Sequence, residues 1–258
     1  MVIPAHRMLI GIALAAVVAY AGLCVVLFLV QRSLIYHPQR QSFGSSETLT
    51  TFGVPGAELR ISVRPHHGPN ALLYLGGNAE DVSGNLAAFS EAFPDYALYL
   101  LHYRGYGGSS GTPSEAALYS DALALFDEIR AQHPAVTVVG RSLGSGLAVR
   151  LASERPVSRL VLVTPYDSLL ELAARQFPYV PVRWLLLDRF ESWRYAARVT
   201  APTAILAAER DEVIPRSSTE RLRSRFALGV ASYTVIAGTD HDSISDSPAY
   251  LPALKGPP

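Results

Sequence analysis

A serine stands between two glycines where an apolar segment changes into a helical pattern. Residues 136–140 (VTVVG) are apolar and rich in valine, residues 143–154 are helix-forming, and Ser142 lies at the corner between them. In the pattern G-x-S-x-G the glycines permit a sharp turn from strand to helix that exposes the serine hydroxyl. Such a hydroxyl can attack an electrophile once a base removes its proton. The pattern therefore predicts that Ser142 is a nucleophile; the alternative is a serine that only caps the helix.

A second segment, residues 107–111, has the same pattern around Ser109. Its glycines lie several residues after an apolar segment. Thr112, Pro113 and Glu115 are suited to the N-cap, first and third positions of a helix, so the next helix is expected to begin separately, with Thr112 as its N-cap. We therefore expect Ser109 to lie in a flexible loop without a catalytic role.

A serine nucleophile needs a general base, and the base needs an acid that orients it. Of the seven histidines only His241 follows Ser142, in a loop after the apolar residues 232–237. Asp211, in a loop after the apolar residues 203–208, is the expected acid. Four other carboxylates are alternatives, two of them close in the chain and two more distant: Glu209, Glu212, Asp167 and Asp188.

Attack on a carbonyl group also requires N–H donors for the negative charge that develops on its oxygen. The N–H of Leu143 lies at the start of the predicted helix, where the helix dipole favours an anion. The second donor is expected from Asn78, which follows the apolar residues 71–75 and the pair Gly76 and Gly77. Leu143 and Asn78 are thus the predicted oxyanion-hole residues.

Short apolar segments alternate with amphipathic stretches from about residue 57 onward, which is typical of a mainly parallel sheet flanked by helices. Loops at the carboxyl ends of such strands bind ligands, and the candidate residues lie in such loops. The α/β domain is expected to span residues 49–250, followed by a flexible tail at residues 251–258. Strands are expected at residues 57–63, 71–75, 97–102, 136–140, 159–164, 203–208 and 232–237.

An uncharged apolar segment covers residues 8–30. As a helix these 23 residues could cross the hydrocarbon of a bilayer, about 30 Å. The sequence predicts a single N-terminal transmembrane anchor and a juxtamembrane linker at residues 31–48. A signal peptide cleaved after Ala21 is the alternative, although the apolar run continues for nine residues beyond it. Arginines flank both ends, so the side of the membrane on which the domain lies is left open.

The composition argues against several other classes of protein. Basic and acidic residues balance at 22 each, so nothing suggests nucleic acid as a partner. The single cysteine, Cys24, excludes an intramolecular disulfide, and no cluster of His and Cys residues indicates a metal site. The expected partners are an acyl substrate and a lipid bilayer, and the oligomeric state is left open.

With these residues assembled, the chain resembles the α/β-hydrolase superfamily, and within it a membrane-anchored branch similar to protein depalmitoylases and serine-aminopeptidase-like hydrolases. The resemblance implies an α/β-hydrolase fold and serine hydrolysis by Ser142, Asp211 and His241 through an acyl-enzyme, without a cofactor. The chain departs from the branch at His102, where an aspartate is usual, and at Gly76, where a histidine is usual. Both places are expected near the site. The resemblance covers about residues 30–245 and is carried by QRSLIYHP, YLGGNAEDVSGNL, YRGYGGSSGTPSE, VVGRSLGSGLAVRLA, TPYDSLLELA, FPYVPVRWLLLDRFES, ERDEVIP and GTDHDSI.

Residues 165–200 are rich in aromatic side chains and lie where this fold inserts a lid. An apolar lid above the serine favours a lipophilic acyl chain, so Tyr166, Phe177 and Trp184 are expected to contact the substrate. Alternatively, these rings only pack the lid helices. The chain is therefore predicted to cleave carboxylic esters or thioesters at a membrane. A serine peptidase with the same three residues is the first alternative, and a membrane scaffold without activity is the second.

Overall fold

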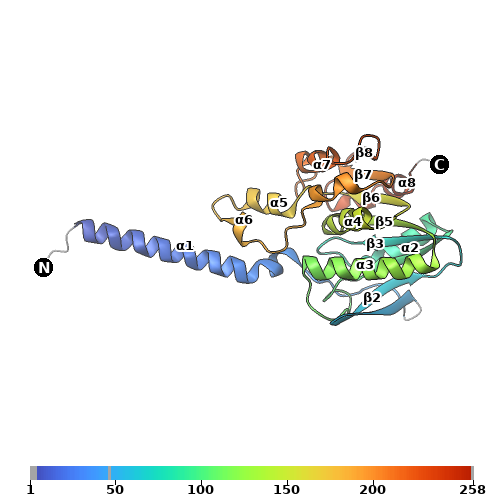
Figure 1. The fold of residues 1–258 in the computed structure, drawn as a ribbon, viewed down its shortest axis with the longest axis horizontal. Coiled ribbons are helices and arrows are strands. Elements are labelled where there is room, and N and C mark those ends of the chain that lie inside the picture. The colour runs from blue at the N-terminus through green and yellow to red at the C-terminus, as the bar shows by residue number, and fades with distance from the viewer. Residues whose placement is uncertain (1–4, 46–47, 257–258) are drawn as a thin grey trace.

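The structure is a computed structural model that describes residues 5–45 and 48–256. One long helix leads away from a body in which a sheet lies between helices (Figure 1). The helices are α1 (Ala5–Ile35), α2 (Leu86–Ala92), α3 (Glu115–Gln132), α4 (Leu143–Glu154), α5 (Leu169–Gln176), α6 (Val182–Leu185), α7 (Arg216–Arg223) and α8 (Tyr250–Lys255). The strands are β1 (Leu49–Val54), β2 (Ala57–Arg64), β3 (Asn70–Leu75), β4 (Tyr96–Leu101), β5 (Ala135–Arg141), β6 (Arg159–Val163), β7 (Thr203–Ala208) and β8 (Ala231–Ile236).

Within the described residues, eight strands form one sheet in the order β1-β2-β4-β3-β5-β6-β7-β8. The strands from β4 through β8 pair in parallel, whereas β2 pairs antiparallel with both β1 and β4. All seven expected strands are present, and each lies within one residue of its expected bounds. The sequence pattern missed β1, because this edge strand is short of buried apolar residues and Thr50 and Thr51 are largely exposed.

The buried strands fill two apolar layers, one on each face of the sheet, because successive side chains point to opposite faces. Along β3, Leu73 and Leu75 belong to one layer, and Leu72 and Tyr74 belong to the other. Helices α3 and α4 contribute to the first layer, and α2 and α8 contribute to the second. The carboxyl ends of the parallel strands β3, β5, β7 and β8 thus lie at one edge of the sheet.

The expectation of a flexible tail at residues 251–258 is wrong for its described part. Tyr250 and Leu254 of α8 are buried against the second apolar layer. The Arg159 side chain donates a hydrogen bond to the carbonyl oxygen of Leu254, at the end of the helix. Residues 257–258 lie outside the described part of the chain. The sequence did not predict this helix, because its apolar pattern is short and is interrupted by a proline. The helix depends on its tertiary contacts.

The start of α3 also differs from the expectation. Ser114, rather than Thr112, caps the helix, because its backbone is extended and its hydroxyl accepts a backbone N–H of the first turn. The carboxylate of Glu115 accepts the N–H groups of Arg189 and Phe190, and so it connects α3 to the lid region.

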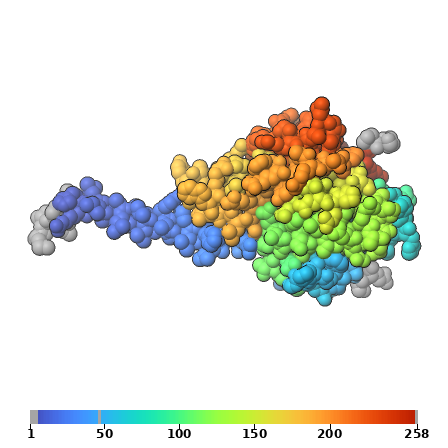
Figure 2. Space-filling view, viewed as in Figure 1, coloured from blue at the N-terminus to red at the C-terminus, as the bar shows by residue number. Residues whose placement is uncertain are grey.

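Helix α1 is long and apolar enough to cross a membrane over His6–Ile35, with a mean hydropathy of 2.7 in an 18-residue window. It is therefore a candidate membrane span. The helix continues to Ile35, so the first part of the expected linker at residues 31–48 is helical. Gln31 and Tyr36 are buried against the body. Figure 2 shows the segment that contains α5 and α6 lying against α1 near the body.

Candidate active site

Ser142 occupies the turn between β5 and α4 with strained backbone angles, φ 47° and ψ −115°. The glycines on either side are there because the chain has no room for a Cβ atom. A Cβ on Gly140 would lie 2.6 Å from the Cβ of Ala148, and a Cβ on Gly144 would collide with the carbonyl of Leu75. The side chain of Ser142 makes no capping hydrogen bond to α4. The hydroxyl is therefore held in place by the backbone and left free for another partner.

The structure brings Ser142, His241 and Asp211 together. His241 Nε2 lies 3.0 Å from Ser142 Oγ, and His241 Nδ1 lies 2.9 Å from Asp211 Oδ2. The carboxylate is held in turn, because Oδ1 accepts the N–H groups of Val213 and Ile214. This arrangement allows the imidazole to take a proton from the hydroxyl while the carboxylate fixes its orientation.

The four alternative carboxylates have other partners or positions. Asp167 pairs with Arg221 at 2.6 Å, and Asp188 pairs with Arg32 at 3.0 Å. The Glu209 carboxylate accepts the N–H of Gly238, and Glu212 lines a cavity without a hydrogen bond to His241 among the described residues.

The turn after β3 lies against the start of α4. The carbonyl of Gly76 accepts the N–H of Gly144 at 3.1 Å and the hydroxyl of Tyr103 at 2.9 Å. Among the described residues, the N–H groups of Asn78 and Leu143 donate to no other protein group. Both residues line the same cavity as Ser142. The two predicted donors therefore lie beside the serine with their N–H groups available for a ligand.

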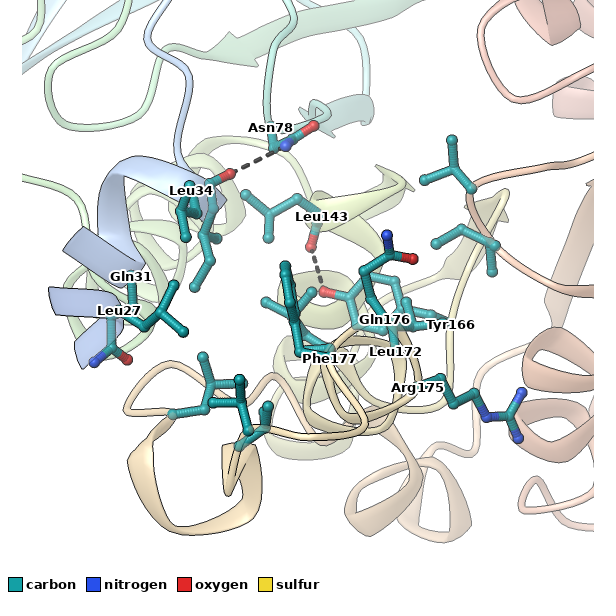
Figure 3. A pocket seen from close by; sticks show the side chains of 18 of the residues that line it. Leu27, Gln31, Leu34, Asn78, Leu143, Tyr166, Leu172, Arg175, Gln176 and Phe177 are labelled. Carbon is teal, nitrogen blue, oxygen red and sulfur yellow. Dashed lines mark hydrogen bonds between the residues drawn. The ribbon is translucent and has the colours of Figure 1, made fainter. Parts of the chain in front are cut away.

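A cavity of about 540 Å³ begins at Ser142 and is lined mostly by apolar side chains. Tyr166 and Phe177 line it, as expected, whereas Trp184 does not and is 86% exposed on α6. Tyr166 is buried beneath the serine turn, where its hydroxyl donates to the carbonyl of Leu143 (Figure 3). A volume of this size suits a lipophilic molecule. No group of His, Cys, Asp or Glu residues within the described ranges could hold a metal ion.

The sequence matches the model of the α/β-hydrolase fold family over residues 70–197. The chain belongs to this family. An uncharacterized protein of Mycobacterium tuberculosis is 34% identical over 268 residues, which cover 96% of this chain and 94% of that protein. The lysophosphatidylserine lipase ABHD12 of Mus musculus is 32% identical over 192 residues, which cover 64% of this chain and 45% of the lipase.

Solved structures show the same fold at low sequence identity. The esterase Pf2001 of Pyrococcus furiosus aligns with a TM-score of 0.67 at 16% identity, covering 86% of this chain and 98% of that chain. The mouse α/β-hydrolase domain-containing protein 10 aligns with a TM-score of 0.64 at 18% identity, covering 80% and 94% of the two chains. The α/β-hydrolase fold expected from the resemblance is therefore confirmed.

The two departures from the α/β-hydrolase branch have different surroundings. Gly76 lies in the turn after β3, where a Cβ would lie 2.5 Å from Cγ1 of Val82. His102 does not line the cavity. It is buried, with Nε2 2.9 Å from Ser62 Oγ, and burial lowers the pKa of its imidazole to about 4. His102 is therefore a neutral structural residue of this hydrolase.

Ser109 has a structural role, but its loop is ordered rather than flexible. Its hydroxyl is buried, donates to the carbonyl of His102 at 2.8 Å and accepts the N–H of Arg60. Gly107 has a positive φ of 55°, and a Cβ there would overlap the His102 ring. The second G-x-S-x-G segment thus packs a loop onto β2 and β4.

Sequence reasoning missed a partly buried ion pair next to the site, formed by Glu80 and Arg141. The Glu80 carboxylate accepts the N–H of Gly77 at 2.7 Å, in the turn after β3, and pairs with Arg141 at 3.6 Å. The Arg141 guanidinium also donates to the carbonyl oxygens of His241 and Asp242. This pair connects the turn after β3 to the loop that carries His241. The sequence feature that could have indicated this contact is the acidic residue three positions after Gly77. At this spacing a side chain can accept a backbone N–H of the turn.

Proposed function

We propose that the protein is a membrane-anchored serine hydrolase that cleaves carboxylic ester or thioester bonds of lipophilic acyl substrates. The observation that carries the proposal is the 3.0 Å distance from Ser142 Oγ to His241 Nε2 at the wall of an apolar cavity. The 32% identity to a lysophosphatidylserine lipase supports a lipid ester as the class of substrate. Helix α1, with its exposed apolar surface, serves as the anchor.

In the first half of the reaction, Ser142 Oγ attacks the carbonyl carbon while His241 Nε2 accepts the hydroxyl proton. Asp211, which accepts the Nδ1 hydrogen of the ring, stabilises the imidazolium that forms. The oxygen of the tetrahedral intermediate receives the N–H groups of Leu143 and Asn78. The imidazolium then gives its proton to the leaving alcohol or thiol as the C–O or C–S bond breaks, and the acyl group stays on the serine.

In the second half, water replaces the leaving group. His241 takes a proton from the water molecule, whose oxygen attacks the acyl carbon, and the same two N–H groups receive the oxyanion. The proton returns from His241 to Ser142 Oγ as the acyl-oxygen bond breaks and the free acid leaves. The chain's own groups are sufficient for both halves.

The anchor raises the concentration of the site near lipophilic substrates, because tethering replaces diffusion in three dimensions by a local search. A peptide substrate would need a partner for its charged amino terminus, and Glu212 is the one carboxylate among the described residues that line the cavity. Arg175 and Glu212 are the charged members of the lining, and the rest are largely apolar. This apolar lining favours an acyl chain over a peptide.

Labelling by a fluorophosphonate tests the nucleophile in the full-length protein. We expect Ser142→Ala to be unlabelled. The wild type should be labelled, and so should Ser153→Ala, a control on helix α4, which follows Ser142. Labelling that persists in Ser142→Ala would mean that another residue is the nucleophile. An unlabelled wild type would favour the scaffold without activity.

A substrate series tests the bond that is cleaved. p-Nitrophenyl esters and the matching thioesters, with acyl chains from acetyl to palmitoyl, are compared with aminoacyl-p-nitroanilides. We expect kcat/KM to rise with acyl length and the anilides to be poor substrates. Preferred cleavage of the anilides would instead identify a serine peptidase.

A further inference from the structure

The cavity beside Ser142 has one wall that does not come from the α/β body. Leu27, Gln31 and Leu34 of α1 line it, and they face the α5–α6 segment, residues 169–188, across the cavity. Figure 3 shows Leu172 and Phe177 of that segment on the side away from α1. The candidate membrane anchor is thus also part of the lining of the candidate active site.

Specific contacts hold α1 against the α5–α6 segment. The Gln31 side chain donates to the carbonyl of Leu185 and accepts the N–H of Leu187. Arg32 pairs with Asp188 at 3.0 Å, and Asp188 also accepts the hydroxyl of Tyr36 at 3.1 Å. These polar contacts lie at the C-terminal end of α6 and just beyond it, so they fix the position of this part of the wall relative to α1.

The contact extends toward the middle of the apolar helix. Tyr20 donates its hydroxyl to the backbone carbonyl of Tyr179 at 2.7 Å, and Tyr20 lies 15 residues before Ile35, about 22 Å along the helix axis. If residues 8–30 cross the bilayer, the tip of the α5–α6 segment lies at the depth of the hydrocarbon. A backbone carbonyl at that depth needs an internal donor, which Tyr20 supplies.

The exposed surface of the α5–α6 segment fits this placement. Tyr179 is 88% exposed and Trp184 is 86% exposed, although large aromatic rings are seldom left in water to this extent. The rim of the cavity is apolar as well, because Phe28 and Phe177 both line the cavity and are partly exposed. An apolar rim that adjoins the bilayer permits a hydrocarbon chain to pass from lipid to cavity without crossing water.

We propose that the last turns of α1 form one wall of the acyl-binding site, and that the acyl chain of a membrane lipid enters between α1 and the α5–α6 segment. This assignment rests on the proposed ester or thioester hydrolysis. It makes Leu27 and Leu34 determinants of acyl-chain length, and it explains the exposure of Trp184 as contact with lipid.

Paired tryptophan variants of α1 test the wall in full-length protein reconstituted into phosphatidylcholine vesicles. Leu27→Trp places a larger side chain in the cavity wall that α1 forms. Leu29→Trp is the matched control, because Leu29 is 73% exposed and does not line the cavity. Each variant is assayed with p-nitrophenyl butyrate and p-nitrophenyl palmitate, and Ser142 is titrated with a fluorophosphonate to count active sites.

We expect Leu27→Trp to lower the ratio of kcat/KM for the palmitate ester to kcat/KM for the butyrate ester by about tenfold or more, with both values referred to the active sites counted by the Ser142 titration. Leu29→Trp should resemble the wild type with both esters. Equal chain-length profiles for the two variants would overturn the assignment, and so would equal losses on both esters in Leu27→Trp. Failure of the wild type to hydrolyse any ester or to react at Ser142 would instead overturn the proposed function itself.

Discussion

Burial of His102 predicts that the protein loses stability as the pH falls below 6.5. The imidazole is 2% exposed, and desolvation lowers its pKa from the ordinary value of 6.5 to about 4. Above pH 6.5 the ring is neutral in both the folded and the unfolded chain, so it adds no pH dependence. Below pH 6.5 the unfolded chain binds the proton first, and the free energy of unfolding therefore falls until the pH reaches about 4.

The size of this effect follows from the two pKa values. A difference between 6.5 and about 4 corresponds to about 3 kcal/mol of stability lost between those pH values. For a domain of this size, that loss lowers the melting temperature by about 6 to 12 °C. His102→Gln keeps a polar side chain at the position but removes the titration, so the variant should lack this part of the pH dependence.

The assay is thermal unfolding of wild type and His102→Gln in the same detergent at pH 7.5, 5.5 and 4.5. The other histidines and the carboxylates titrate in both proteins, so they cancel in the difference between the two curves. The melting temperature of the wild type should fall relative to that of His102→Gln as the pH decreases from 7.5 to 4.5. If the melting temperatures of the two proteins fall in parallel across this range, protonation of His102 does not contribute to the loss of stability.

Asp211→Asn should lower kcat about 10⁴-fold with butyrate esters while circular dichroism stays unchanged, because the carboxylate that orients His241 is lost; wild-type turnover would assign the acid to another residue. Arg141→Met should lower kcat by about 10²-fold with little change in KM, because the histidine loop loses its guanidinium contacts. A change confined to KM would contradict this positioning role. Leu254→Ala should cost about 2–5 kcal/mol in chemical unfolding, since the side chain is fully buried; no loss would contradict the packing of α8. Trp184→Ala should leave cleavage of soluble esters unchanged, as the indole lies outside the cavity, and a large loss would place it in the site.

The sheet was predictable because its strands are buried on both faces and therefore appear as short apolar runs. Residues 203–208, TAILAA, are buried throughout, and the expected and observed strands coincide. The edge strand β1 lacks this signal, because only one side of it is paired and its threonines face solvent. The α8 helix was missed for a related reason. It is short, and tertiary contacts rather than helix propensity stabilise it.

The arrangement of Ser142, His241 and Asp211 was predictable because each follows a strand of one parallel sheet. Strands β5, β7 and β8 end at the same edge, so their loops meet there although Ser142 and His241 are 99 positions apart in the sequence. The position of Trp184 was not predictable in this way. An aromatic residue in this segment can face the cavity or the surface, and the choice depends on how α6 packs against the rest of the chain, which the local sequence does not encode.

The proposed role of α1 in the acyl-binding site could not be predicted from the sequence, because its apolar residues are equally those of a membrane span. Leu27 and Leu34 look like any other lipid-facing residues in an apolar helix, because a wall for an acyl chain and a surface for a bilayer require the same side chains. The polar residues just beyond the span are more informative. Gln31 and Arg32 bond to the α5–α6 segment, whereas a helix that served only as a tether would need no such partners. Removing α1 would therefore leave Ser142 beside a cavity that lacks one wall, so a truncated soluble domain would be a poor measure of the acyl-chain preference of the whole protein.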